Sequence, residues 1–63
     1  MKYSVLYYKG VKIIKRNDYD CIDIAKIEYN NPVKTECEFM SIHNNDTNVT
    51  EFIKAVKYDQ DIL

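Results

Sequence analysis

The stretch YSVLYYKGVKIIKR, residues 3–16, predicts a β-hairpin near the start of the chain. Aromatic and β-branched residues fill both of its halves, and such residues fit a pleated strand surface. Between the halves, Lys9-Gly10 forms a two-residue connection in which glycine can take the positive φ that tight hairpin turns need. The expected register places Leu6 opposite Ile13.

The following part of the chain predicts a second pair of strands, Asp20–Tyr29 and Lys34–His43. Asn31-Pro32-Val33 would link them, because proline cannot donate a hydrogen bond to a strand ladder. A helix over residues 19–29 is the alternative for the first member of the pair.

The second strand pair is expected to carry apolar side chains on a face that one helix cannot cover. With Tyr29 opposite Thr35, the residues of this predicted apolar face are Ile22, Ile24, Met40 and Ile42. Exposed apolar patches usually mark interfaces, so we expect this face to bind a partner protein or a second copy of the chain. The alternative is that a strand bulge, or the C-terminal Ile62 and Leu63, covers it.

The last segment predicts a helix over residues 48–58. Apolar residues recur there at the i, i+3, i+4 and i+7 spacing of one helical stripe, namely Val49, Phe52, Ile53 and Val56. Asn48 can cap the start of this helix, and Glu51 follows at the spacing of a capping box.

Together these segments predict one small α+β domain over residues 1–63, in the order ββββα. A small antiparallel sheet of about four strands would carry one C-terminal helix on one face. The parts are a basic hairpin over residues 1–16, an acid-rich strand pair over residues 17–45 and the helix over residues 48–58. So short a chain buries only about 60% of its unfolded surface, which leaves apolar surface for a partner.

Charge is divided unevenly along the chain, although the net charge is only −1. Residues 1–16 contain five basic residues and no acidic one, whereas residues 17–63 contain four lysines and ten acidic residues, a net charge of −6. Such carboxylates would steer the chain toward a basic surface, for example a nucleic-acid channel. The residues expected to form this acidic partner-binding surface are Glu28, Glu36, Glu38, Asp59 and Asp61.

The basic hairpin gives a second, different hypothesis. Its expected register projects Tyr3, Tyr7, Lys12 and Arg16 from one face. Basic groups interleaved with aromatic rings can bind phosphates and stack on bases, so these four residues are the candidate nucleic-acid contacts. The alternative is a basic edge strand that resists aggregation.

Residues for catalysis or metal binding are too few. The chain has one histidine, two cysteines and one glycine. A closed zinc site takes four Cys or His ligands, and phosphate-binding loops need more than one glycine. The expected register places Cys21 opposite His43, a thiol–imidazole pair that nothing orients. The sequence therefore predicts no enzyme, no metal site and no cofactor.

The sequence favours a cytoplasmic location. Lys2 and Lys9 enclose a segment that is too short and too polar for a signal peptide, and no apolar run approaches the roughly 20 residues that cross a bilayer. In a reducing compartment, Cys21 and Cys37 are expected to be free thiols.

In general character the chain resembles the small anti-CRISPR and related counter-defence proteins of phages of low-GC bacteria. The resemblance lies in the compact strand-rich layout, the acid-rich stretch Asp18–Glu38 and the predicted Asn48–Tyr58 helix. It implies an inhibitor, encoded by a phage or mobile element, that binds a host defence or nucleic-acid-processing enzyme such as a Cas effector, with a homodimer as one option. No functional residue is carried over from it. A small nucleic-acid-binding or regulatory domain is the alternative, and an accessory phage assembly protein is a third hypothesis.

Overall fold

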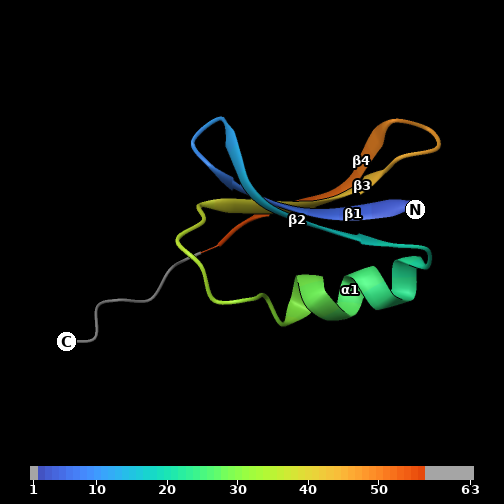
Figure 1. Cartoon of the computed structure of the whole chain (residues 1–63), viewed down its shortest axis with the longest axis horizontal. Helices are drawn as coiled ribbons and strands as arrows, with labels where there is room; N and C mark the ends of the chain where they lie inside the picture. The colour runs from blue at the N-terminus through green and yellow to red at the C-terminus, as the bar shows by residue number, and fades with distance from the viewer. Residues whose placement is uncertain (1, 57–63) are drawn as a thin grey trace.

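The computed structural model describes residues 2–56 of the 63-residue chain. Its elements follow one another in the order ββαββ (Figure 1). They are β1 (Tyr3–Lys9), β2 (Lys12–Tyr19), α1 (Ile22–Asn30), β3 (Phe39–Asn44) and β4 (Val49–Ala55). The predicted class, a small α+β domain with one four-stranded antiparallel sheet and a single helix, is confirmed. The predicted C-terminal place of the helix is wrong, because α1 lies between β2 and β3.

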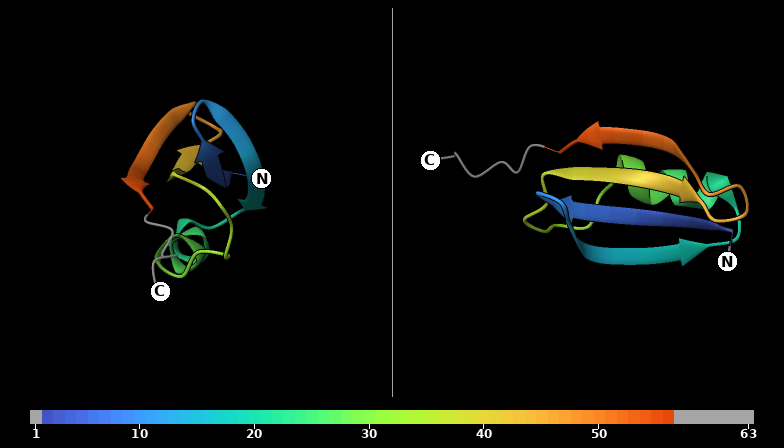
Figure 2. Two further views of the ribbon diagram at one scale, coloured as in Figure 1. Left: turned by 90° about the vertical axis from the view of Figure 1, so that its left-hand side faces the viewer. Right: turned by 90° about the horizontal axis from the view of Figure 1, so that it is seen from above.

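The strands form one antiparallel sheet in the order β2-β1-β3-β4. Two hairpins therefore meet at β1 and β3, and β2 and β4 are the edges. The tips of both hairpins curve away from α1 (Figure 1), and β2 and β4 form the two sides of an arch above the helix (Figure 2, left). The helix covers one face of the sheet only.

The first hairpin is confirmed, but its register differs from the predicted one. Lys9 pairs with Lys12, so the loop is Gly10-Val11, and Gly10 has the positive φ of 65° that was expected of it. A β-bulge between Tyr7 and Tyr8 then shifts the pairing, and Leu6 lies opposite Arg16 instead of Ile13. A one-residue shift of this kind turns the following side chains of β2 to the other face of the sheet.

The predicted strand over residues 20–29 is wrong, and the alternative helix is confirmed. Ala25, Glu28 and Tyr29 lie at the i, i+3, i+4 spacing that turns one side of α1 toward the sheet. Asp23 in the first turn favours the helix N-terminus electrostatically. The helix stops before Pro32, because a residue that precedes proline avoids the helical conformation.

The predicted helix over residues 48–58 is also wrong, because Val49–Ala55 is strand β4. Asn48 has a φ of 61°, a left-handed conformation that closes a hairpin loop and differs from the extended conformation of a helix cap. Residues 57 and 58 of that prediction lie outside the described residues. Of the predicted strand Lys34–His43, only the part from Phe39 onward is β-structure, so residues 17–45 do not form a strand pair.

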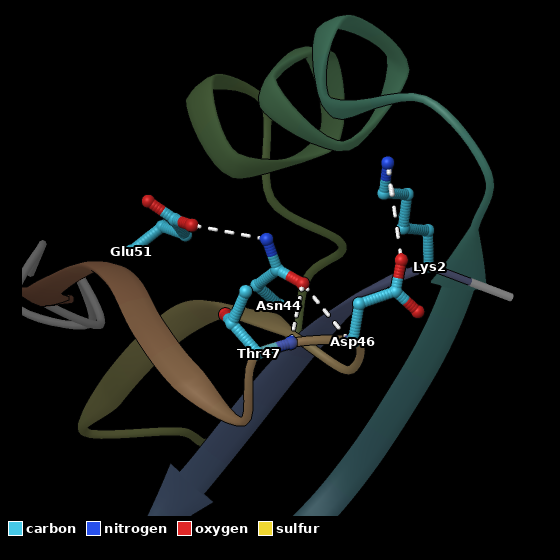
Figure 3. A network of polar contacts seen from close by, with 5 residues as sticks. All are labelled: Lys2, Asn44, Asp46, Thr47 and Glu51. Carbon is cyan, nitrogen blue, oxygen red and sulfur yellow. Dashed lines mark hydrogen bonds and ion pairs between the residues drawn. The ribbon is translucent and has the colours of Figure 1, made fainter.

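Side-chain hydrogen bonds fix the turn between β3 and β4 (Figure 3). The Asn44 Oδ1 accepts from the backbone N–H groups of Asp46 at 2.9 Å and Thr47 at 3.2 Å, while its Nδ2 donates to Glu51 at 3.1 Å. Asp46 also lies 3.8 Å from the Lys2 ammonium. Because Asn44 satisfies these groups locally, the chain reverses here into a hairpin.

The core lies between α1 and the sheet. Its buried members come from β1, α1, β3 and the loop before β3, and they are Val5, Tyr7, Ala25, Cys37, Met40 and Ile42. Every one of these side chains faces the covered side of the sheet, so the other side contributes little to this core.

Candidate binding face of the sheet

The sheet surface opposite α1, called the open face from here on, has no helix or strand over it within residues 2–56. Side chains alternate between the two faces along a strand. Val5 and Tyr7 point into the core, so Leu6 and Tyr8 point to the open face. Through strand pairing, the open face also receives Phe39 and Ser41 of β3, Ile53 of β4 and Ile13 of β2.

One end of the open face contains a shallow apolar hollow of about 220 Å³. Its lining residues come from β1, the first hairpin loop, β3 and β4, and they are Tyr8, Gly10, Phe39 and Ile53. Phe39 is 42% exposed and Ile53 is 65% exposed, and Ile13 opposite Tyr8 is half exposed. Apolar side chains gathered in this way are typical of a surface that binds another molecule.

Two acidic residues bond to the tip of the first hairpin, whose Gly10 lines the hollow. The Glu38 carboxylate accepts a hydrogen bond of 2.9 Å from the backbone N–H of Gly10. The Glu36 carboxylate lies 3.2 Å from the ammonium of Lys9 in an exposed ion pair. Charged groups therefore lie at the hairpin tip next to the apolar hollow, and binding surfaces usually combine an apolar centre with polar surroundings.

The other end of the open face is polar and internally bonded. The Ser4 hydroxyl donates to Asp18 at 2.6 Å, and the Arg16 guanidinium lies 2.8 Å from the same carboxylate. The His43 ring contacts Asn48 at 3.0 Å and Thr50 at 3.5 Å. These polar groups satisfy one another, so the apolar hollow is the part of the open face that is suited to bind a partner.

The predicted apolar face does not exist as one surface. Met40 and Ile42 are fully buried beneath α1, whereas Ile22 and Ile24 lie on α1 itself, where Ile24 is half exposed. The prediction is wrong because residues 22–30 form the helix that covers this side of β3, instead of a strand beside it.

The predicted acidic surface is divided in a similar way. Glu36 and Glu38 are exposed beside the hollow, but Glu28 is only 9% exposed and faces the sheet. Asp59 and Asp61 lie outside the described residues. The expected cluster of five carboxylates thus reduces to two on the described surface, together with one buried carboxylate that has a different role.

Glu28 joins α1 to the sheet. Its carboxylate accepts hydrogen bonds from the hydroxyls of Tyr7 and Tyr19 and from the Asn17 Nδ2, the last at 2.8 Å. Burial acts to raise the pKa of Glu28, but the bonds from Tyr19, Tyr7 and Asn17 outweigh it and lower the pKa below its ordinary value. Burial, together with the bond to this carboxylate, raises the pKa of Tyr7. Tyr7 also accepts from the backbone N–H of Val33 at 3.1 Å, so the cluster is fully bonded and structural.

The predicted nucleic-acid contacts do not lie on one surface. Tyr7 is fully buried and Tyr3 packs against the core, so neither ring is presented for base stacking. The bulge in the first hairpin places Arg16 on the open face, opposite to the side of Tyr7, and Arg16 is paired with Asp18. Lys12 remains exposed at the hairpin tip. The prediction of a shared face is therefore wrong.

The described residues that could carry covalent chemistry lie apart. Cys21 is exposed at the start of α1, whereas His43 pairs with Ser4 and Thr50 in the sheet, so the predicted Cys21–His43 pairing is wrong. Cys37 is free and buried, and burial raises the pKa of its thiol. Between residues 2 and 56, no group of three His, Cys, Asp or Glu side chains is placed to hold a metal ion.

The residues of the hollow were not predicted as a site. Tyr8, Phe39 and Ile53 are far apart in the sequence. The predicted helix over residues 48–58 also placed Ile53 outside the sheet. The β-branched residues Val49, Thr50 and Ile53 are the signal that could have indicated a strand there.

Comparison with known proteins identifies no relative: no protein-family model, curated protein or solved structure matches the chain. In the part of the chain that the structure describes, no helix has both the length and the apolar character needed to cross a bilayer.

Proposed function

We propose that this protein is a non-enzymatic binding domain that receives apolar side chains of a partner protein in the hollow of its open face. The hollow formed by Tyr8, Phe39 and Ile53 is the observation that carries the proposal. One face of an antiparallel sheet usually meets water with polar side chains, whereas these positions carry large apolar ones.

The energy available at this surface supports a specific complex. Fully burying an Ile or Phe side chain contributes about 1.5–3 kcal/mol. Ile53 and Phe39 still expose 65% and 42% of their surface, so a partner that covers both would gain roughly 2–3 kcal/mol from these two residues. A few such anchors commonly dominate the free energy of a protein–protein complex.

The partner class that we propose is a host defence or nucleic-acid-processing enzyme, such as a Cas effector, which the chain inhibits by occupying its surface in the host cytoplasm. Such enzymes present basic channels, and the exposed Glu36 and Glu38 bond to the hairpin tip next to the hollow, where they would steer docking to a basic surface. The general resemblance to small counter-defence proteins of phages supports the same class.

Titration of purified host nucleases and Cas effectors with the full chain tests this proposal. Ile53→Ser should weaken binding by about tenfold, because the lost apolar area is worth about 1.4 kcal/mol. Ile27→Ser is the matched control, because Ile27 is 63% exposed but lies on α1, and it should leave the affinity unchanged. The proposal is wrong if none of the enzymes binds, or if both variants weaken binding equally.

The steering role of these two acidic residues has its own readout. The double substitution Glu36→Lys and Glu38→Lys should slow association and change the dissociation rate little. A stopped-flow series at rising salt would check this, because screening should bring the association rates of wild type and variant together.

A further inference from the structure

The two edges of the sheet differ in how well they are protected from pairing with another strand. Natural edge strands are commonly protected by charged side chains. The β2 edge follows this rule, with charges at half of its eight positions, Lys12, Lys15, Arg16 and Asp18. The β4 edge has only Glu51 and Lys54, although six of its seven residues are exposed.

Both charges on β4 already bond to their own chain, which weakens the protection that they give to its edge. The Lys54 ammonium donates to the backbone oxygen of Tyr29 at 2.7 Å and lies 4.4 Å from the centre of the Tyr29 ring. Glu51 accepts from the Asn44 side chain at 3.1 Å (Figure 3). Exposed apolar side chains also lie on both faces of β4, with Phe52 on the α1 side and Ile53 on the open face.

The outer edge of β4 has no strand partner within residues 2–56. The N–H of Val56 donates inward to the oxygen of Glu38 at 2.8 Å. Bonded and non-bonded positions alternate along an antiparallel pair, so Ile53 and Ala55 turn their N–H and C=O groups away from β3, to the outer edge. Together with the hollow, β4 therefore offers a partner strand both backbone hydrogen bonds and an adjoining apolar surface.

We infer that β4 pairs with the β4 strand of a second copy of this chain. An antiparallel pair about a two-fold axis perpendicular to the sheet keeps both helices on the same side and is self-complementary. In this register Ile53 of one copy lies opposite Ile53 of the other. Phe52 then lies opposite Lys54 of the second copy, and Glu51 lies opposite its Ala55, so no two like charges are opposed. A register shifted by two residues in one direction would place Lys54 opposite Lys54 of the second copy. A register shifted by four residues in the other direction would place Glu51 opposite Glu51. Like-charge repulsion disfavours both alternatives.

This pairing would change the binding surface as well as the oligomeric state. The two Ile53 side chains would meet at the axis, so the two hollows would become one continuous apolar surface on an eight-stranded sheet. A single pair of edge strands buries less area than a standard interface, so the dimer is weak and concentration-dependent. The inference rests on the edge of β4 and does not depend on the identity of the partner proposed above.

Sedimentation equilibrium of the full chain, from about 10 μM to about 500 μM, tests the inference by mass action. Wild type should pass from monomer to dimer. Ala55→Pro, which removes an outward N–H and retains the bonds to β3, should raise the dimer dissociation constant at least tenfold. Ile53→Lys should do the same by opposing two charges at the axis, whereas Ile27→Lys is the matched control on α1 and should dimerise as wild type does.

A second measurement keeps the test independent of whether a variant folds. Hydrogen exchange of wild type, followed by NMR, should slow at the Ile53 and Ala55 amides as concentration rises, because they become bonded in the dimer. Tyr8→Ser, which alters the hollow and leaves the edge intact, should retain the dimer even where it weakens a partner complex. Monomer at all concentrations, or a dimer that Ala55→Pro and Ile53→Lys leave unchanged, would overturn the inference.

Discussion

Replacing Glu28 is the sharpest test of how α1 is held on the sheet. The carboxylate is 9% exposed and accepts bonds from the Tyr7 hydroxyl, the Tyr19 hydroxyl and the Asn17 side chain. A buried hydrogen bond to a charged group contributes about 1.5–3 kcal/mol, and a partly exposed one contributes less. Glu28→Ala removes all three bonds and leaves the buried Tyr7 hydroxyl without its acceptor, so we expect it to lower the free energy of unfolding by about 3–4 kcal/mol.

A loss of this size is close to the whole stability of so small a domain. At about 0.05–0.15 kcal/mol per residue, the chain has roughly 3–9 kcal/mol in total. Glu28→Ala would thus unfold a large fraction of the protein, and Glu28→Gln is the more informative variant. It retains one acceptor oxygen and loses the charge, so the expected loss is about 1.5–2 kcal/mol.

Urea denaturation followed by circular dichroism and tyrosine fluorescence measures both losses, since the chain has six tyrosines and no tryptophan. Glu36→Gln is the matched control, because its ion pair with Lys9 is exposed and should contribute less than about 0.5 kcal/mol. If Glu28→Ala cost no more than Glu36→Gln, the carboxylate would not hold the helix and the reasoning would fail.

The pH dependence provides a second check on the same residue. The folded-state pKa of Glu28 is lowered, so its stabilising contribution is present above the unfolded pKa of about 4.3 and is lost as the pH falls through the lower folded value. As the medium is acidified below about pH 4.5, the free energy of unfolding of wild type should therefore fall and approach that of Glu28→Gln. A constant difference between the two proteins from pH 7 to pH 3 would contradict the assigned charge state.

Two further predictions concern single positions in the sheet and are checked by the same urea denaturation. The Ser41 hydroxyl is buried and has no hydrogen-bond partner among residues 2–56. Ser41→Ala should therefore leave the free energy of unfolding unchanged or raise it by up to about 1 kcal/mol. A decrease of more than about 1 kcal/mol would contradict this. Gly10 has a φ of 65° with open space around its α-carbon. Gly10→Ala should therefore lower the free energy of unfolding by about 1 kcal/mol from backbone strain alone, and Gly10→Asn should lower it less. Equal losses for the two variants would argue against strain.

How far the fold could be predicted from sequence depended on whether the deciding contacts were local. The first hairpin was predictable because Gly10 and its flanking β-formers lie together in the chain. The helix over residues 22–30 was only an alternative, because Ile22 and Ile24 fit a strand as well as a helix. The bonds of Glu28 to Tyr7 and Tyr19 hold this helix on the sheet, and only the tertiary structure brings these residues together.

The error at the C-terminal end has a different cause. The spacing of Val49, Phe52, Ile53 and Val56 fits one helical stripe. In β4, however, the neighbouring Phe52 and Ile53 point to opposite faces of the sheet. Asn48 was predicted to cap a helix. In the structure it has a left-handed conformation in the turn that the Asn44 side chain stabilises by hydrogen bonds. The hollow could not be predicted once Ile53 was placed in a helix.

Folding and binding use neighbouring residues of the same strands. Tyr7 is buried and bonded to Glu28, whereas Tyr8 lines the hollow; Met40 is buried, whereas Phe39 is exposed. Polar residues at Tyr8 and Phe39 would leave the α1 side of the core intact and would remove the aggregation hazard of an apolar sheet surface. Large apolar side chains at these positions are therefore not explained by the requirements of the α1 core, and the proposed burial against a partner would account for them.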